Sequence, residues 1–206
     1  LGYGWTIGLV AACGGLVFGF DGVAVGGAKP FYEAWFSITD PAQSGWAMSS
    51  ALVGCVFGAL ISGWCADNLG RRLPLILSAV LFSASAWGTA VASSFDMFVV
   101  YRIVGGVGIG LASALSPLYI AEVSPAEKRG RFVAVNQLTI VIGVLAAQLI
   151  NLMIAEPVET GATQQMIVET WNGQMGWRWM FGAELVPALA VLVLMFVVPE
   201  SPHWLM

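Results

Sequence analysis

The sequence predicts an all-α membrane protein with six transmembrane helices. Of its 206 residues, 58% are apolar and 10% are charged, against about 25% charged in an ordinary soluble domain. Apolar stretches follow one another along the chain, each close to the roughly 20 residues that span a bilayer. The charged residues collect in the short segments between them. We therefore expect the lipid bilayer to surround the folded chain.

The six spans form one bundle that covers residues 1–206. The first span contains an acidic residue and lacks the basic start and cleavage site of a signal peptide, so we expect it to stay in the mature protein. Segment 155–176 is expected to be an outside loop. Hydropathy and helix-breaking residues place the spans at about 4–27, 46–66, 74–94, 97–121, 132–154 and 177–198.

The distribution of Lys and Arg predicts that both chain ends are cytoplasmic. An even number of spans places the two ends on one side of the membrane. The opposite connections hold only Lys29, with Arg178 at a helix mouth. Cytoplasmic loops are enriched in basic residues, and connections 67–73 and 122–131 contain most of them: Arg71, Arg72, Lys128, Arg129 and Arg131.

A weak internal repeat links these two cytoplasmic connections. In each, an acidic residue at a helix end, Asp67 or Glu122, is followed by two arginines. Such recurrence is typical of bundles built from duplicated units. We therefore expect two inverted three-helix repeats.

Glycines four residues apart recur inside the spans, and we interpret them as sites of close helix packing, because small residues let helix backbones approach in lipid. The pairs are Gly15 with Gly19, Gly22 with Gly26, Gly54 with Gly58, and Gly106 with Gly110.

Several classes of function are excluded by composition. The net charge of −4 and the lack of a basic, aromatic-interleaved patch argue against nucleic acid. The cysteines lie in apolar segments without metal-ligand spacing, so we expect them to pack. No nucleophile and base pair points to an enzyme. We expect no metal and no cofactor.

Three ionisable residues lie well inside the expected spans: Asp21, Arg102 and Glu184. A charge at membrane depth costs about 2.5–3.5 kcal/mol on insertion scales, so each needs a partner or a function. With a helical rise of about 1.5 Å per residue, all three lie roughly 8–11 Å below the outer surface. We therefore expect one buried cluster.

Within this cluster, Arg102 can hold both carboxylates, because a planar guanidinium binds two acids and stays ionised. If the arginine moves away, a desolvated carboxylate takes up a proton. Proton binding would then depend on helix geometry, as coupling requires. The alternative is a permanent salt bridge that only fixes helix packing.

Phe18 and Gln137 are the candidate substrate contacts. A sugar site joins amides that hydrogen-bond hydroxyls to an apolar ring against the C–H face. Gln148 is a second amide inside a span. The alternative roles are packing for Phe18 and interhelical hydrogen bonds for the two amides.

Long motifs follow one another along the chain. They are GGLVFGFD at 14–21, GWCADNLGRR at 63–72, YRIVGGVGIG at 101–110, PLYIAEVSP at 117–125 followed by RG at 129–130, NQL at 136–138, and PESPHWL at 199–205. These motifs resemble those of the sugar porter family in the major facilitator superfamily, in the same order and over nearly the whole chain. The most similar branch is that of the bacterial xylose/proton symporters.

The resemblance implies proton-coupled transport of a monosaccharide by alternating access in a bacterial inner membrane. It implies that Asp21 carries the proton with Arg102 as partner and Glu184 as third member, and that Phe18 and Gln137 bind sugar. It also implies a cytoplasmic latch of salt bridges between two halves, for which topology-setting charge is the alternative. The latch residues would be Asp67, Arg71, Arg72, Glu122, Arg129, Arg131 and Glu200.

The sequence departs from the family pattern at several places. His203 replaces a common arginine, and Val144 stands where xylose-type members have a second Gln, so the sugar cannot be inherited. Family members have twelve helices, so we expect this chain to be the N-terminal half, with a missing C-terminal half as its partner; a self-associating half-transporter is the alternative. A facilitative sugar, polyol or inositol uniporter and a non-transporting sugar receptor remain alternative functions.

Overall fold

The computed structural model describes residues 3–159, 161–201 and 204, with side chains from residue 14 onward. Helices dominate, and the described residues contain no strand. The long helices are α1 (Tyr3–Trp35), α2 (Pro41–Leu69), α3 (Arg72–Ala90), α4 (Phe95–Val123) and α5 (Arg129–Ile154). They are followed by α6 (Gln164–Glu169), the π-helix η1 (Asn172–Gly176), α7 (Trp177–Gly182) and α8 (Leu185–Val197).

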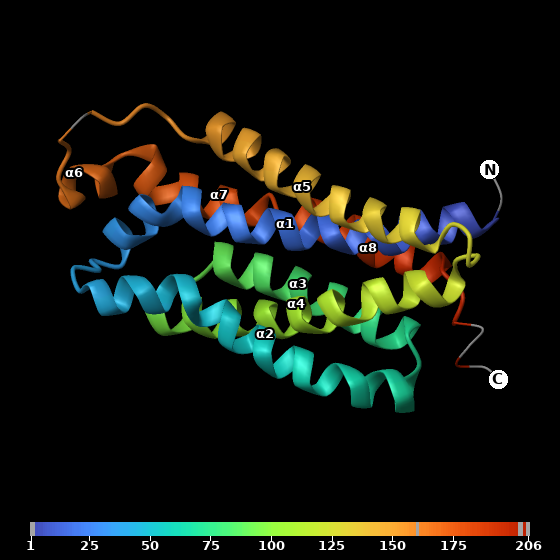
Figure 1. Ribbon diagram of the computed structural model, residues 1–206. Helices are drawn as coiled ribbons and strands as arrows, with labels where there is room; N and C mark the ends of the chain where they lie inside the picture. The colour runs from blue at the N-terminus through green and yellow to red at the C-terminus, as the bar shows by residue number, and fades with distance from the viewer. Residues whose placement is uncertain (1–2, 160, 202–203, 205–206) are drawn as a thin grey trace.

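The helices run up and down as one bundle, and α1 begins at the same end of the molecule where α8 finishes (Figure 1). The α2–α3 and α4–α5 connections lie at that end too, while α6 lies at the other. Among the described residues, α2, α3, α4, α5 and Asn172–Val197 are each long and apolar enough to cross a membrane. Large apolar side chains such as Leu60, Met153 and Val186 are more than 70% exposed, as expected of lipid-facing positions.

Local sequence signals explain where two of the helices begin. Asp40 caps α2, since its carboxylate accepts a hydrogen bond from the backbone N–H of Ala42, and Pro41 occupies the first turn. Ser94 caps α4 by accepting from the N–H of Met97. A capped start fixes where each helix enters the bundle.

Helix packing follows a pattern with internal symmetry. α1 packs along α5, and α2 packs along α4. If α1, α2 and α3 correspond to α4, α5 and the α7–α8 segment, respectively, then the α1–α5 pair of helices corresponds to the α4–α2 pair. This is the pairing expected of the two inverted three-helix repeats.

Glycines bring the paired helices into backbone contact. A Cβ atom added to Gly19 of α1 would lie 2.0 Å from the carbonyl oxygen of Ile140 in α5. In the equivalent pair, one added to Gly106 of α4 would lie 1.9 Å from the carbonyl oxygen of Ala51 in α2. Within the described part of the chain the packing interpretation is wrong for Gly22 and Gly26, where an added Cβ would meet no described atom within 4 Å.

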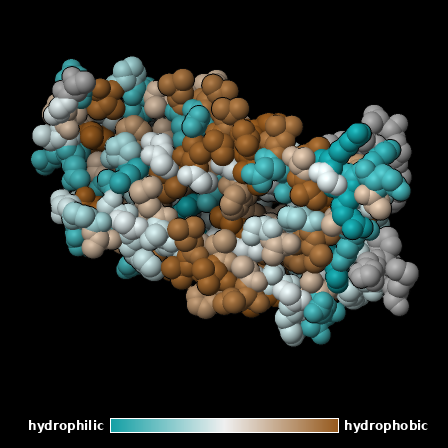
Figure 2. Space-filling model, viewed as in Figure 1, coloured by the Kyte–Doolittle hydropathy of each residue, from teal (hydrophilic) through white to brown (hydrophobic). Residues whose placement is uncertain are grey.

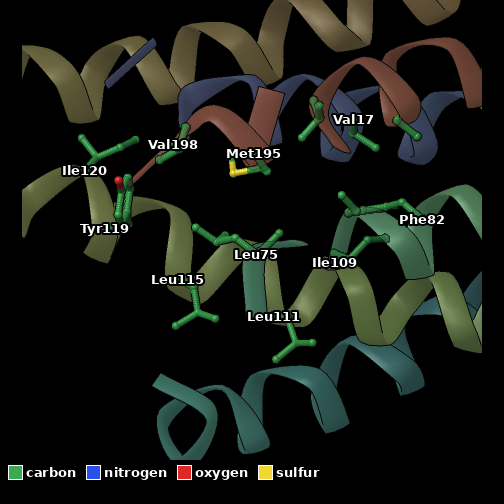
Figure 3. Close-up of a cluster of buried hydrophobic side chains, with 14 of the residues drawn as sticks. Val17, Leu75, Phe82, Ile109, Leu111, Leu115, Tyr119, Ile120, Met195 and Val198 are labelled. Carbon is green, nitrogen blue, oxygen red and sulfur yellow. The ribbon is translucent and has the colours of Figure 1, made fainter. Parts of the chain in front are cut away.

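Two of the buried hydrophobic clusters lie toward opposite ends of the bundle, and a small third cluster contains Phe20, Ala24 and Ala147. Figure 3 shows the first, which includes Leu75 of α3, Leu115 of α4 and Met195 of α8. The second, at the α6 end, is aromatic and includes Tyr32, Phe98, Trp177 and Phe181. Apolar side chains lie around the middle of the molecule, and hydrophilic ones gather at its ends (Figure 2). This banding suits a protein that lies across a bilayer.

The helix ends differ from those expected from sequence. α1 continues to Trp35 although Pro30 lies inside it; the proline ring abuts the carbonyl of the residue four positions earlier, and that residue is Gly26. α3 ends at Ala90 rather than near residue 94. The segment expected to be an outside loop contains α6 and η1, and Asn172 ties it to the end of α5 through two hydrogen bonds with the backbone of Glu156.

The last expected span, 177–198, is divided at residues 183 and 184. Pro187 explains the division, because proline has no N–H to donate to the carbonyl four residues earlier. That carbonyl belongs to Ala183, and it accepts from Val186 instead. Glu184 therefore lies at a bend between α7 and α8.

Candidate functional site

The buried charges lie where α1, α4 and the α7–α8 bend meet. Asp21, Arg102 and Glu184 are 6%, 3% and 3% exposed, respectively. The Nη1 atom of Arg102 donates to the Oδ1 atom of Asp21, which forms an ion pair. Glu184 interacts electrostatically with both partners. The structure thus brings all three predicted residues into one cluster.

The guanidinium of Arg102 is buried beside an aromatic ring. The guanidinium carbon lies 5.8 Å from the centre of the Phe181 ring, a distance suited to a cation–π interaction. Its Nε atom has no hydrogen-bond partner among the described residues. A guanidinium with a spare donor and two nearby acids has more than one way to pair, which a coupling element needs.

The Asp21–Arg102 pair also lines a groove with a volume of about 500 Å³. Phe18, which is 38% exposed, lines the same groove. A smaller hollow of about 140 Å³ adjoins it, shares Phe18 and Ile140 with it, and is lined by Gln137. The predicted substrate contacts and the predicted proton carrier therefore line two adjoining hollows that share Phe18 and Ile140.

Close helix packing makes this placement possible. The glycines of α1 seat it against α5, so Phe18 and Gln137 flank one hollow. The glycines of α4 seat it against α2, so the residue 102 side chain reaches α1. Val144, at the position where xylose-type relatives were expected to carry Gln, lines the groove as an apolar wall.

The residues predicted to form a cytoplasmic latch fall into two groups. Arg71 pairs with Glu122 at 3.0 Å, and Glu200 accepts hydrogen bonds from the backbone N–H groups of Arg71 and Arg72. Gly70 has φ of 81°, and a Cβ there would lie 2.6 Å from Glu200. This network ties the α2–α3 turn to the ends of α4 and α8.

The side chains of the second group, Asp67, Arg129 and Arg131, are exposed at the same end, and no ion pair joins them to the described part of the chain. The Nη2 atom of Arg72 donates to the carbonyl of Phe196. His203, the departure noted in the closing motif, lies outside the described residues.

Sequence reasoning missed Tyr32, which lies beyond the expected end of the first span. Its side chain is fully buried between Phe98 and Phe181, and its hydroxyl has no hydrogen-bond partner among the described residues. It interacts electrostatically with Arg102. Tyr32 could have been found only if the first helix had been expected to continue past Pro30, because proline favours a helix end.

Arg178 was also placed only at a helix mouth. It donates to the carbonyl of Ala90 at the end of α3 and stacks on Trp177 and Trp35, at 4.5 and 5.1 Å from the ring centres. It therefore joins the α6 ends of three helices. No group of three metal-ligating side chains occurs in the part of the chain that the structure describes.

Comparisons with known protein sequences match this chain to sugar transporters. A family model described as "Sugar (and other) transporter" matches residues 7–206. The D-xylose-proton symporter of Escherichia coli (strain K12) is 38% identical over 229 residues, which cover 99% of this chain and 45% of that protein. The glucose transport protein of Synechocystis sp. is 43% identical over 197 residues, covering 95% of this chain and 41% of that protein.

Solved structures agree with these sequence matches. The structure of the xylose transporter XylE from E. coli in a partially occluded inward open conformation superimposes with a TM-score of 0.90 at 37% identity. That match covers all of this chain and 52% of the other. The chain thus spans about half the length of the relatives it matches.

Proposed function

Because the chain belongs to the sugar transporter family of the major facilitator superfamily, we propose that it forms half of a multi-pass membrane protein that moves a monosaccharide together with a proton. The observation that carries this proposal is the buried Asp21–Arg102 pair on the wall of a groove that also holds Phe18. The ion pair and a predicted sugar contact line the same groove, so sugar binding there can alter the Asp21–Arg102 pair, and separation of that pair can alter sugar binding.

The proton step depends on the Asp21 carboxylate. While Arg102 pairs with it, the carboxylate stays ionised. When a helix movement separates the two, an unpaired charge in a low-dielectric interior is costly, and a proton neutralises it. Glu184 is a second buried acid that interacts electrostatically with Arg102 and would hold it during that separation. Protonation of Asp21 is thereby tied to one arrangement of α1 against α4.

The sugar step uses the neutral residues of the same groove. The amide of Gln137 offers both a donor and an acceptor to sugar hydroxyls, and the ring of Phe18 offers an apolar face to the C–H groups. A second half, with its own contacts, closes the other side of the groove. Alternating access then comes from rocking the two halves about the site.

The charged residues at the end of the bundle opposite α6 bear on the orientation of the chain in the membrane and on the predicted latch between the two halves. We propose that the α2–α3 and α4–α5 connections lie in the cytoplasm of a bacterium, by the basic-residue rule, and that both chain ends lie there too. The exposed charges of Asp67, Arg129 and Arg131 are available to pair with the other half. The network of Arg71, Glu122 and Glu200 holds their helices in place.

The replacement Asp21→Asn tests the coupling in the full-length protein reconstituted in liposomes. Asparagine keeps the size of the side chain but cannot take up a proton at transport pH. We expect sugar exchange between the two sides to persist and accumulation driven by a proton gradient to be lost. Accumulation at the original level would refute the coupling role and leave a facilitative uniporter as the better description.

A further inference from the structure

The groove between α1 and α5 continues past the predicted sugar contacts. Beyond the groove of Asp21 lies a further hollow of about 590 Å³, which shares Gly22 and Val23 with it. Gln148 and Asn151 of α5 line this hollow, and neither has a role in the proposed transport step. We call it the outer hollow, since it lies toward the α6 end of the helices.

Gln148 faces the same way as the predicted contact Gln137. Eleven residues separate them, and at about 100° per residue Gln148 returns to within about 20° of the same helix face. Along the helix axis the two lie about 16 Å apart. One pyranose ring cannot contact both amides at that spacing, so any ligand at Gln148 occupies a separate position.

The polar groups of the outer hollow suit hydroxyls. Asn151 is 7% exposed, and its Nδ2 atom donates to the carbonyl of Val23 at 3.4 Å. Its Oδ1 atom has no partner among the described residues, although a buried polar atom without a hydrogen bond is costly. The described residues that line the hollow carry no charge. Uncharged amides favour a neutral ligand with donors and acceptors.

The apolar parts of the outer hollow leave space for a ring. Gly22 and Gly26 present bare backbone, because a Cβ atom added at either would have no atom within 4 Å. Gly27 does the opposite: an added Cβ would lie 2.2 Å from Nδ2 of Asn151, so this glycine seats the asparagine. Phe31 and Met180 complete the wall with apolar surface. Amides beside apolar side chains are the combination that binds sugars.

We propose that the outer hollow is a second monosaccharide-binding position. A sugar that enters from the α6 end occupies it before reaching Gln137, and a sugar that returns toward that end occupies it after leaving Gln137. The inference rests on the proposed sugar transport. Its rival is that Gln148 and Asn151 hydrogen-bond the other half of the protein and never contact substrate. The two differ in stoichiometry: the first requires two sugars per protein, and the second one.

The test is equilibrium binding of radiolabelled D-xylose and D-glucose to the full-length protein in lipid nanodiscs. We expect two sugars per protein, bound in two phases. Gln148→Leu should weaken one phase at least tenfold, as expected when about 1.4 kcal/mol of hydrogen bonding is lost, and Gln137→Leu should weaken the other. Gly26→Leu, which fills the hollow, should reproduce the effect of Gln148→Leu.

Matched controls come from the same chain. Gln165→Leu replaces an exposed amide outside the groove, and Gly63→Leu adds the same side chain where a Cβ also has open space. Both should bind two sugars with unchanged affinity. If Gly26→Leu fails to fold, the binding curve of Gln148→Leu still tests whether the outer hollow binds a sugar.

Two outcomes would overturn the inference while leaving the transport proposal intact: one sugar per unsubstituted protein, or two unchanged phases in Gln148→Leu. If the second outcome comes with a loss of thermal stability, the amide of Gln148 is assigned to contact with the other half. Binding of neither sugar by the unsubstituted protein, together with no flux of any monosaccharide, would instead reject the proposed function itself.

Discussion

Replacing Arg102 with alanine tests the physical basis of the buried cluster. The change leaves Asp21 and Glu184, both under 10% exposed, without the guanidinium that pairs with Asp21 and interacts electrostatically with Glu184. Removing one member of a buried ion pair costs about 3–5 kcal/mol, because the remaining charge is uncompensated. Asp21→Asn should cost less, about 1.5–3 kcal/mol, since it removes a charge-assisted hydrogen bond but leaves Arg102 with Glu184. We therefore expect Arg102→Ala to be the more damaging change.

The assay is SDS-induced unfolding of the full-length protein in micelles, which measures the difference in unfolding free energy between variants. The measurement is repeated as the pH is lowered. Protonation neutralises the two stranded acids, so the deficit of Arg102→Ala should shrink at lower pH. Arg129→Ala removes an exposed arginine and serves as the control, with an expected loss under about 0.5 kcal/mol. A deficit no larger than that of Asp21→Asn, or one that does not change with pH, would refute the reasoning.

Three further replacements test other parts of the structure. Gln137→Ala should weaken sugar binding about tenfold; unchanged affinity in an equilibrium binding assay would return this amide to a packing role. Gly106→Ala should destabilise the protein by about 1–3 kcal/mol, because the new methyl group would meet the Ala51 carbonyl, whereas Gly63→Ala should be nearly neutral; equal melting temperatures would contradict the packing. Glu200→Gln should lower the melting temperature, since it weakens hydrogen bonds from two backbone N–H groups to a carboxylate, and an unchanged melting temperature would show that the α2–α3 turn does not need this charge.

The buried cluster was predictable because it depends on depth. Residue counting from the expected span ends placed Asp21, Arg102 and Glu184 at one level. The structure groups the three side chains, although α1 continues to Trp35, beyond the end from which Asp21 was counted. Counting could not say which acid pairs with the arginine. The ion pair with Asp21 depends on how closely α1 approaches α4, and that distance is set by glycine contacts with two other helices.

Errors in the prediction came from local signals that packing overrode. Pro30 favoured an early end to the first span, but α1 continues to Trp35 and buries Tyr32 beside the cluster. Pro187 was visible in the sequence, yet the bend it causes at Glu184 was not predicted. Proline can end a helix or only bend it, and the neighbouring helices decide which.

Composition and spacing were enough to predict that this chain is a helical membrane bundle with basic connections at one end and three ionisable residues inside its spans. These properties are local, because each depends on the hydropathy or rise of a single helix. Tertiary structure alone decided that Gly19 meets a backbone carbonyl while Gly22 and Gly26 border open space. The same spacing of small residues serves close packing or a hollow according to what lies opposite, and only the arrangement of the other helices supplies that partner.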